Sequence, residues 1–279
     1  MRIRHLSLAM VTFLSLCASS RAVTVTYDGF ASTAGLTLNA SAATVVTGDG
    51  TVLRLSPAAA NRNGSAFSSE VINAADFSTY FRFRITNPGG TVFDCNTVVG
   101  ADGLAFVVQA VSNSIGGIGQ GIGYAGIGTS VISEWDTWCN AANNDPSSNH
   151  VGININGNPN HGAGSPFTAV VAPDFDDGEI WHGWVDYDGT TLEVRTNKTG
   201  SRPAAPTVSR VIDVPTTLGG VDEAYVGFTS ATGADWGNHD LIYWEYRSEF
   251  APIPEPSSVI LAGLGGLALM LARRRRTLR

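Results

Sequence analysis

Residues 134–150 concentrate side chains that bind cations. Glu134 and Asp136 alternate along a predicted strand, so both carboxylates project from the same face. The chain then enters a loop rich in Asn, Asp and Pro, and His150 opens the next predicted strand. The segment offers these candidate ligands: Glu134, Asp136, the carbonyl of Trp138, Asn140, Asp145 and His150.

These donors suit two kinds of cation. Oxygen atoms from carboxylates, amides and carbonyls are the ligands of Ca²⁺, whereas carboxylates joined by an imidazole suit Mn²⁺ or another transition ion. Asp136 and Asp145 are placed to bridge two adjacent ions, which would neutralise a tight carboxylate cluster. A solvated acidic loop is the alternative, but the number of aligned donor types in this short segment favours a metal site.

Short strands must position this loop. Residues 77–85 alternate so that Phe77, Thr79, Phe81, Phe83 and Ile85 share one face. In residues 181–194, Asp188-Gly189 predicts a hairpin turn between two strands. Residues 104–108, 151–155, 225–228 and 241–246 are further predicted strands. Because glycine-rich turns separate these strands and no window has a sustained helical period, we expect an all-β sandwich or jelly roll.

Both ends of the chain are typical of processing signals. Residues 1–22 combine Arg2 and Arg4 with an apolar run and small residues, which is the pattern of a cleaved signal peptide. Residues 251–279 contain Pro254-Glu255-Pro256, a short apolar stretch predicted to be helical, and an arginine cluster. That stretch is short for a membrane span, which needs about 20 residues. A single domain is therefore predicted over residues 23–250.

Charge and cysteine content limit the partners and the compartment. The 279-residue chain has a net charge of −7, and residues 23–250 alone hold 9 basic and 23 acidic side chains. Such an acidic surface repels nucleic acid and anionic membranes. Cys17 lies in the predicted signal peptide, which leaves Cys95 and Cys139. In an exported protein these two favour one disulfide, with two free buried thiols as the alternative.

The segment 134–150 resembles the metal loop of the L-type (legume) lectins at every ligand spacing. The resemblance implies a single concanavalin-like jelly-roll β-sandwich that holds Ca²⁺ and Mn²⁺. By analogy, Mn²⁺ would be bound by Glu134, Asp136, Asp145 and His150, and Ca²⁺ by Asp136, the Trp138 carbonyl, Asn140 and Asp145.

The same resemblance extends to a sugar site. The residues Ala101-Asp102-Gly103-Leu104-Ala105-Phe106 are similar to a family strand whose Asp accepts hydrogen bonds from sugar hydroxyls, after a cis peptide braced through the calcium site. A glycine-rich segment implies a sugar contact from the Gly121 amide, and Asn140 would add a second donor. A variable specificity loop is expected at residues 234–239, where Ala234, Asp235 and Trp236 would contact the glycan. Cys139 stands within the metal loop, and its bond to Cys95 would rigidify the site.

The C-terminal residues resemble a PEP-CTERM tail of Gram-negative bacteria. Such tails imply sorting by an exosortase-type enzyme, with the helix as a transient anchor in the inner membrane and the protein exported to the cell envelope or extracellular matrix. A permanent anchor is the alternative. The expected ligand is a glycan or exopolysaccharide, no nucleic acid partner is expected, and a homodimer is possible because plant relatives dimerise through their back sheets.

Two other functions compete with reversible sugar binding. A laminarinase-type glycoside hydrolase shares the Glu-x-Asp start, but retaining hydrolysis needs a second carboxylate close by, and the positions where those enzymes supply it are Trp138 and Cys139. His161, His182 and His239 stand in no recognisable Ser/His/Asp context and are interpreted as structural or solvated. We therefore expect no enzyme. A structural matrix or adhesion protein that no longer binds sugar remains the other alternative.

Overall fold

The computed structural model describes residues 24–91, 99–115, 117 and 119–254. The predicted signal peptide, Cys95 and the predicted C-terminal helix lie outside the described residues. The predicted boundaries at residues 22 and 250, the disulfide and the anchor therefore stay predictions. None of the helices in the described part of the chain has the length and apolar character of a membrane span.

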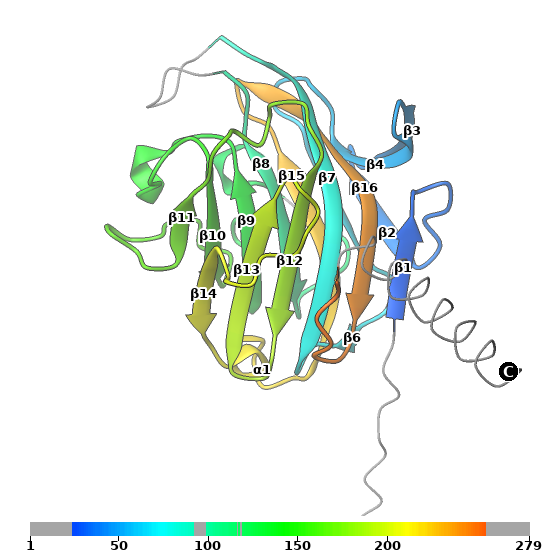
Figure 1. Ribbon diagram of the computed structural model, residues 1–279, viewed down its shortest axis with the longest axis vertical. Coiled ribbons are helices and arrows are strands. Elements are labelled where there is room, and N and C mark those ends of the chain that lie inside the picture. The colour runs from blue at the N-terminus through cyan, green and yellow to red at the C-terminus, as the bar shows by residue number, and fades with distance from the viewer. Residues whose placement is uncertain (1–23, 92–98, 116, 118, 255–279) are drawn as a thin grey trace, which may run out of the picture.

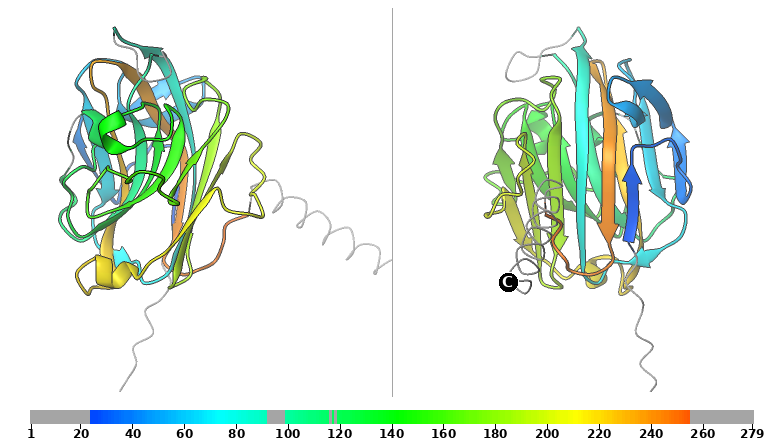
Figure 2. Two further views of the ribbon diagram at one scale, coloured as in Figure 1. Left: turned by 90° about the vertical axis from the view of Figure 1, so that its left-hand side faces the viewer. Right: turned by 45° about the vertical axis from the view of Figure 1, so that its right-hand side comes forward.

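Two eight-stranded antiparallel sheets face each other as the layers of a sandwich (Figures 1 and 2). The first sheet runs in the order β14 (Val208–Val211), β13 (Thr191–Asn197), β12 (Trp181–Tyr187), β7 (Phe77–Gly89), β16 (Trp236–Arg247), β4 (Gly50–Ser56) and β3 (Ala43–Thr47), and β1 (Thr24–Asp28) also pairs with β16. The second sheet runs in the order β11 (Thr168–Val170), β10 (His150–Ile155), β9 (Ser130–Asp136), β8 (Gly103–Gln109), β15 (Glu223–Ala231), β5 (Asn63–Ser68) and β2 (Leu36–Ala40), and β6 (Ile72–Asn73) also pairs with β15. The predicted all-β sandwich is confirmed.

The main core lies between the sheets. In β7, the predicted alternation turns Phe77, Phe81 and Phe83 inward, where each side chain is fully buried. Phe81 meets the edges of Trp135 from β9 and Phe228 from β15, with ring centroids 4.9 Å away in both cases. Because each buried aromatic ring removes a large apolar area from water, worth roughly 2–3 kcal/mol, this layer fixes the position of β9 relative to the first sheet.

The predicted hairpin is present between β12 and β13. Asp188 Oδ1 accepts hydrogen bonds from the backbone amides of Thr190 and Thr191, at 2.8 and 2.7 Å. Gly189 has a φ of +92°, which a residue without a side chain adopts at little cost. The turn chemistry read from the sequence therefore corresponds to the turn that forms.

A second, smaller core covers the outer face of the second sheet. Ile122, Tyr124 and Ile127, from the connection between β8 and β9, pack on Val107 and Ile132 of those two strands. Glu134 and Asp136 share the outward side of β9 with Ile132, since side chains alternate along a strand. The connection therefore shields the acidic end of β9 from solvent.

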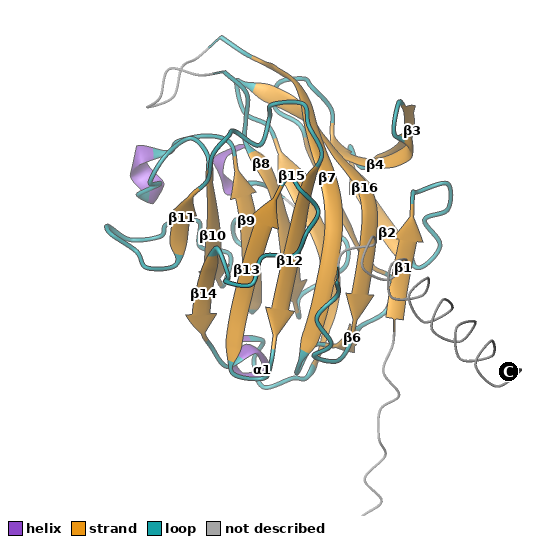
Figure 3. Ribbon diagram, viewed as in Figure 1, coloured by secondary structure: helices purple, strands orange, loops and turns teal. Residues whose placement is uncertain are grey.

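Three short helical turns complete the described structure. These are η1 (Gly119–Gly121), η2 (Ala141–Asn143) and α1 (Val214–Thr217). Figure 3 shows two of the purple turns at the upper end of the sandwich and α1 at the lower end. The loops that follow β8, β9 and β10 all leave the second sheet, so this sheet carries the metal loop and the glycine-rich segment, whereas residues 234–239 lead into β16 of the first sheet.

The outer face of the first sheet carries its own apolar cluster. Tyr80 and Trp184 are buried there beneath Ile253, which is 3% exposed. The backbone amide of Ala251 donates to Ser78 Oγ at 3.1 Å. The last described residues therefore lie against the first sheet, on the side away from the second.

Candidate functional site

The site begins with the pairing of β9 and β10. Their register places Glu134 opposite Gly152 and Asp136 opposite His150. Trp135, between the two acids, points into the main core, so Glu134 and Asp136 turn to the outer face. Their exposed fractions are only 1% and 3%.

The loop between the strands folds back on these acids through backbone-to-carboxylate hydrogen bonds. The amide of Trp138 donates to Asp136 Oδ1 at 2.6 Å, and the amide of Asn140 donates to Asp145 Oδ2 at 2.6 Å. Asn144, which follows η2, has φ 59° in the left-handed region that Asn tolerates. The loop thereby returns Asp145 to the end of β9.

Two groups of potential metal ligands result, each with ligand atoms within 4.8 Å of one another. One group contains Asp136, Asp145 and His150, all of them predicted ligands. The other contains Glu134, His150 and His161. His150 belongs to both groups, so the two sets form one continuous cluster.

His161 is the residue that the sequence did not reveal. Its Nε2 lies 2.8 Å from Glu134 Oε1 and 3.5 Å from Asp145 Oδ1, and its side chain is 1% exposed. It comes from the loop after β10, where its amide donates to the carbonyl of Asn143 in η2 at 2.9 Å. The only signal in the sequence is a histidine shortly after the metal loop, because the contact depends on how two loops fold against each other.

Burial and like charge shape the electrostatics of the cluster. Burial raises the pKa of Asp136 well above its ordinary value, and the nearby carboxylates of Glu134 and Asp145 add to the rise. Burial likewise raises the pKa of Asp145 to about 6. Burial alone would raise the pKa of Glu134, but hydrogen bonds with His150 and His161 outweigh it and lower the pKa to about 2. A set of buried carboxylates that repel one another is an environment that a cation stabilises.

The donor set fits the two ions that the sequence suggests. Asn140 Oδ1 is buried and accepts no hydrogen bond from the described residues. Together with the Asp136 and Asp145 carboxylates it supplies the hard oxygen atoms that Ca²⁺ prefers. The imidazoles lie on the Glu134 side of the cluster, where a transition ion finds mixed oxygen and nitrogen ligands.

Asp102 lies beside the metal loop and is bonded to it through the backbone. The Ala101–Asp102 peptide is cis, as the resemblance implied. The Asp102 carbonyl accepts a hydrogen bond from the amide of Thr137 at 3.1 Å, one residue after β9. The carboxylate is 4% exposed, and its Oδ2 accepts no hydrogen bond from the described residues. Gly103 permits this approach, because a Cβ there would lie 2.2 Å from the carbonyl oxygen of Trp135.

Gly233 lies beside the Asp102 carboxylate. A Cβ built on Gly233 would lie 3.6 Å from Asp102 Oδ2 and 4.0 Å from the Cα of Gly119. Gly119, Gly233 and Asp102 therefore form one small neighbourhood. Gly121 is buried at the end of η1, and its predicted sugar contact stays a prediction.

The predicted specificity loop at residues 234–239 is too long. β16 begins at Trp236, which pairs with Gly89 of β7, and His239 is buried with its Nδ1 2.9 Å from Ser56 Oγ. Ala234 is exposed, as expected of a loop tip. Asp235 is only 1% exposed, and its Oδ1 accepts from the amide of Thr91 at 2.9 Å. The family resemblance placed these residues in a loop, whereas from Trp236 onward they form the first part of β16.

Asp235 also influences Asp102. Burial raises the pKa of Asp102 to about 7, and the charge of Asp235 contributes to that rise. The two buried acidic side chains therefore lie close enough to interact electrostatically.

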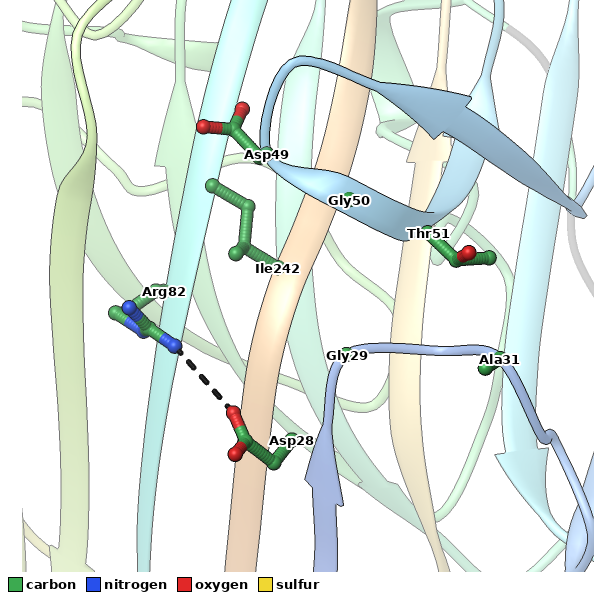
Figure 4. A pocket seen from close by; sticks show the side chains of 8 residues that line it. All are labelled: Asp28, Gly29, Ala31, Asp49, Gly50, Thr51, Arg82 and Ile242. Atoms are coloured by element: carbon green, nitrogen blue, oxygen red, sulfur yellow. Dashed lines mark ion pairs between the residues drawn. The ribbon is translucent and has the colours of Figure 1, made fainter.

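Surface pockets lie at two other places. One is lined by Asn144, Asp145 and Pro146 of the metal loop and by residues 163–170. The other lies between the turn after β1, the β3–β4 turn and the first sheet, and Figure 4 shows the Arg82–Asp28 ion pair across it, with 3.8 Å between the charged groups. Arg82 and Asp28 belong to the first sheet and its margin, so this second pocket is separate from the acidic cluster.

Comparison with known proteins gives two family matches. Residues 22–260 match the legume lectin domain, and residues 252–276 match the PEP-CTERM protein-sorting motif. The L-type lectin-domain containing receptor kinase VIII.1 of Arabidopsis thaliana is 30% identical over 209 residues, 73% of this chain and 27% of that protein. Favin of Vicia faba is 27% identical over 191 residues, 66% of this chain and 75% of that protein. This chain thus spans only about a quarter of the receptor kinase's length.

Solved structures agree at the level of the fold. The basic winged bean lectin with Tn-antigen has a TM-score of 0.66 and 22% identity, covering 81% of this chain and 98% of that one. The lectin from Bauhinia forficata in complex with GalNAc has a TM-score of 0.66 and 21% identity, with coverage of 81% and 98%. Because the legume lectin match spans residues 22–260 and the fold agrees with it, the chain belongs to the legume lectin domain family.

Proposed function

We propose that this protein binds glycans reversibly at Asp102, and that Ca²⁺ and a transition ion in the neighbouring acidic cluster hold Asp102 in place. The observation that carries the proposal is the hydrogen bond from the Thr137 amide to the Asp102 carbonyl. It joins the candidate sugar acceptor directly to the segment that the cations would order. A buried carboxylate oxygen without a protein donor is also what a hydroxyl-rich ligand requires.

The cations have a structural task in this proposal. Ca²⁺ is assigned to Asp136, the Trp138 carbonyl, Asn140 and Asp145, and Mn²⁺ or a related ion to Glu134, Asp136, Asp145 and His150. Each ion supplies positive charge that offsets the repulsion among buried carboxylates. The protein residues then do the binding: Asp102 accepts from sugar hydroxyls, and the Asn140 amide and the Gly121 backbone N–H donate to them.

The glycan class is a surface or exported polysaccharide. The PEP-CTERM motif supports recognition by an exosortase-type enzyme and export to the envelope or matrix of a Gram-negative cell. The winged bean and Bauhinia forficata lectins named above are in complex with Tn-antigen and GalNAc, which supports a saccharide as the ligand class. The proposal keeps Ala234, Asp235 and Trp236 as glycan contacts and includes a homodimer.

A glycan array tests this function. The purified protein is applied with Ca²⁺ and Mn²⁺, then after chelation, and alongside the variants Asp102→Ala and Asp28→Ala. We expect binding that chelation abolishes and that Asp102→Ala reduces at least about tenfold, as expected when a buried hydrogen-bonding group is lost. Asp28, whose side chain is 87% exposed on the first sheet, provides the matched control and should change nothing.

The same array separates the competing functions. Glycan binding that survives chelation contradicts the role of the cations, and a folded Asp102→Ala variant with full affinity removes the proposed site. A folded, metal-loaded protein that binds no glycan supports the structural matrix alternative. Release of sugar from a β-glucan that disappears in Glu134→Gln would instead identify a hydrolase.

A further inference from the structure

His161 occupies a position in the acidic cluster that a metal ligand would occupy. Its Nε2 is 3.1 Å from His150 Nε2, in addition to its short distance from Glu134. Two nitrogen atoms bound at a right angle to one ion, each about 2.1 Å from it, lie about 3 Å apart. The two imidazoles are therefore spaced as neighbouring ligands of a single ion.

Both rings are oriented by their other nitrogen. His150 Nδ1 lies 3.0 Å from the carbonyl oxygen of Ser147, and His161 Nδ1 lies 3.0 Å from Asn154 Oδ1. The amide nitrogen of Asn154 donates to Tyr124 OH at 2.9 Å, so its oxygen faces His161. Because both partners are acceptors, each ring donates from Nδ1 and presents Nε2 to the cluster. Histidines that bind metals are held in the same manner.

The strand beneath His161 leaves room for the ring. Gly152 lies opposite Glu134 in the pairing of β10 with β9. A Cβ on Gly152 would stand 2.6 Å from Glu134 Oε1 and 2.8 Å from His161 Cε1. Any larger residue would therefore push the imidazole away from the carboxylate, and the glycine makes this contact possible.

We propose that His161 Nε2 is a further protein ligand of the transition-metal position, beside Glu134, Asp136, Asp145 and His150. A site with two imidazoles favours ions with a stronger preference for nitrogen, such as Zn²⁺ or Co²⁺, over Mn²⁺. The inference rests on the proposed metal-organised function and specifies which ion that site selects. In the competing arrangement, a protonated His161 forms an ion pair with Glu134 and replaces the transition-metal ion.

Calorimetric titration distinguishes these arrangements. The chelated, Ca²⁺-supplemented protein is titrated with Zn²⁺ and with Mn²⁺, alongside His161→Gln and the matched control His182→Gln. We expect tighter binding of Zn²⁺ than of Mn²⁺ and a loss of at least about tenfold in Zn²⁺ affinity in His161→Gln. Ca²⁺ affinity should be the same in all three proteins, and His182→Gln, on β12 of the first sheet, should bind Zn²⁺ normally.

X-ray absorption at the zinc edge measures the number of imidazole ligands around the bound ion in the unaltered protein. Two imidazoles around the ion in the unaltered protein support the inference, and one imidazole overturns it. Unchanged Zn²⁺ affinity in a folded His161→Gln also overturns it, and increased affinity identifies His161 as the substitute for the ion. If the inference about His161 is wrong, Ca²⁺-dependent glycan binding on the array is still expected. If the proposed function is wrong, chelation does not change glycan binding on the array.

Discussion

Asp102 is a buried carboxyl group beside a second acid, and its ionised form is costly in the folded protein. Its pKa is raised from 3.8 to about 7. The folded state therefore holds a proton that the unfolded chain releases between these values, and the free energy of unfolding falls as the pH rises through this window. Sugar binding needs the ionised Asp102 carboxylate as an acceptor, and this is the form that burial in the folded protein destabilises.

The variant Asp102→Asn should separate these two effects. The amide has nearly the same shape but does not titrate, so the variant should lose this part of the pH dependence and be more stable than the original protein above pH 7. Denaturant unfolding in chelator at a series of pH values measures the difference. Glycan binding should be weakened in the same variant, since the amide nitrogen replaces an acceptor oxygen. Identical slopes of stability against pH in the two proteins would contradict the assignment.

Individual residues differ in how far the sequence reveals them. The metal-loop donors follow one another along the chain, so their spacing alone shows that they belong together, and the structure brings Glu134, Asp136, Asp145 and His150 into one cluster. His161 and Gly119 enter through loops whose paths depend on tertiary packing. Sequence analysis accordingly treated His161 as isolated, and the sugar contact of Gly121 stays a prediction.

At the scale of elements, alternation along strands was the reliable signal. In β7 it identified the face that packs in the core, and in β9 it placed two acids on the face opposite Trp135. The family resemblance, by contrast, placed residues 236–239 in a loop, whereas they pair with β7 as the start of β16. Polar and glycine residues occupy this part of the strand, so no hydrophobic pattern marked it.

The loop between β9 and β10 should depend on the cations for its order. It is held by backbone amides that donate to Asp136 and Asp145, and removing cations leaves those acids repelling one another. Chelation should therefore speed hydrogen exchange at residues 137–149, including the Thr137 amide that reaches Asp102. The amides of β7, whose side chains pack in the main core, serve as the internal control. Equal hydrogen-exchange rates in the loop with and without chelator would contradict the role of the cations in ordering it.

At the scale of the whole molecule, the two outer faces have different tasks. The second sheet presents the acidic cluster, and the first sheet is contacted by residues 251–253. Burial of the Ile253 side chain against this face is favoured by about 2 kcal/mol over its exposure to water. That segment precedes most of the sorting motif, which spans residues 252–276.

The variant Ile253→Asp should release this segment without disturbing the glycan site. A carboxylate placed against Tyr80 and Trp184 loses its hydration, so the segment should detach from the first sheet. Limited proteolysis should then cleave faster near residues 249–254, while glycan affinity stays the same. Val211→Asp, at a position 82% exposed on β14, is the matched control and should leave the cleavage rate unchanged. A fall in glycan affinity in Ile253→Asp would show that the two faces are coupled.

The contact of Ile253 with the first sheet places the start of the sorting motif on the face of the domain opposite the acidic cluster. A protein held on a surface through its carboxyl end would stand with Tyr80 and Trp184 toward that support. The acidic cluster, on the outer side of the other sheet, would then point into the surrounding medium, where long polysaccharide chains have free access.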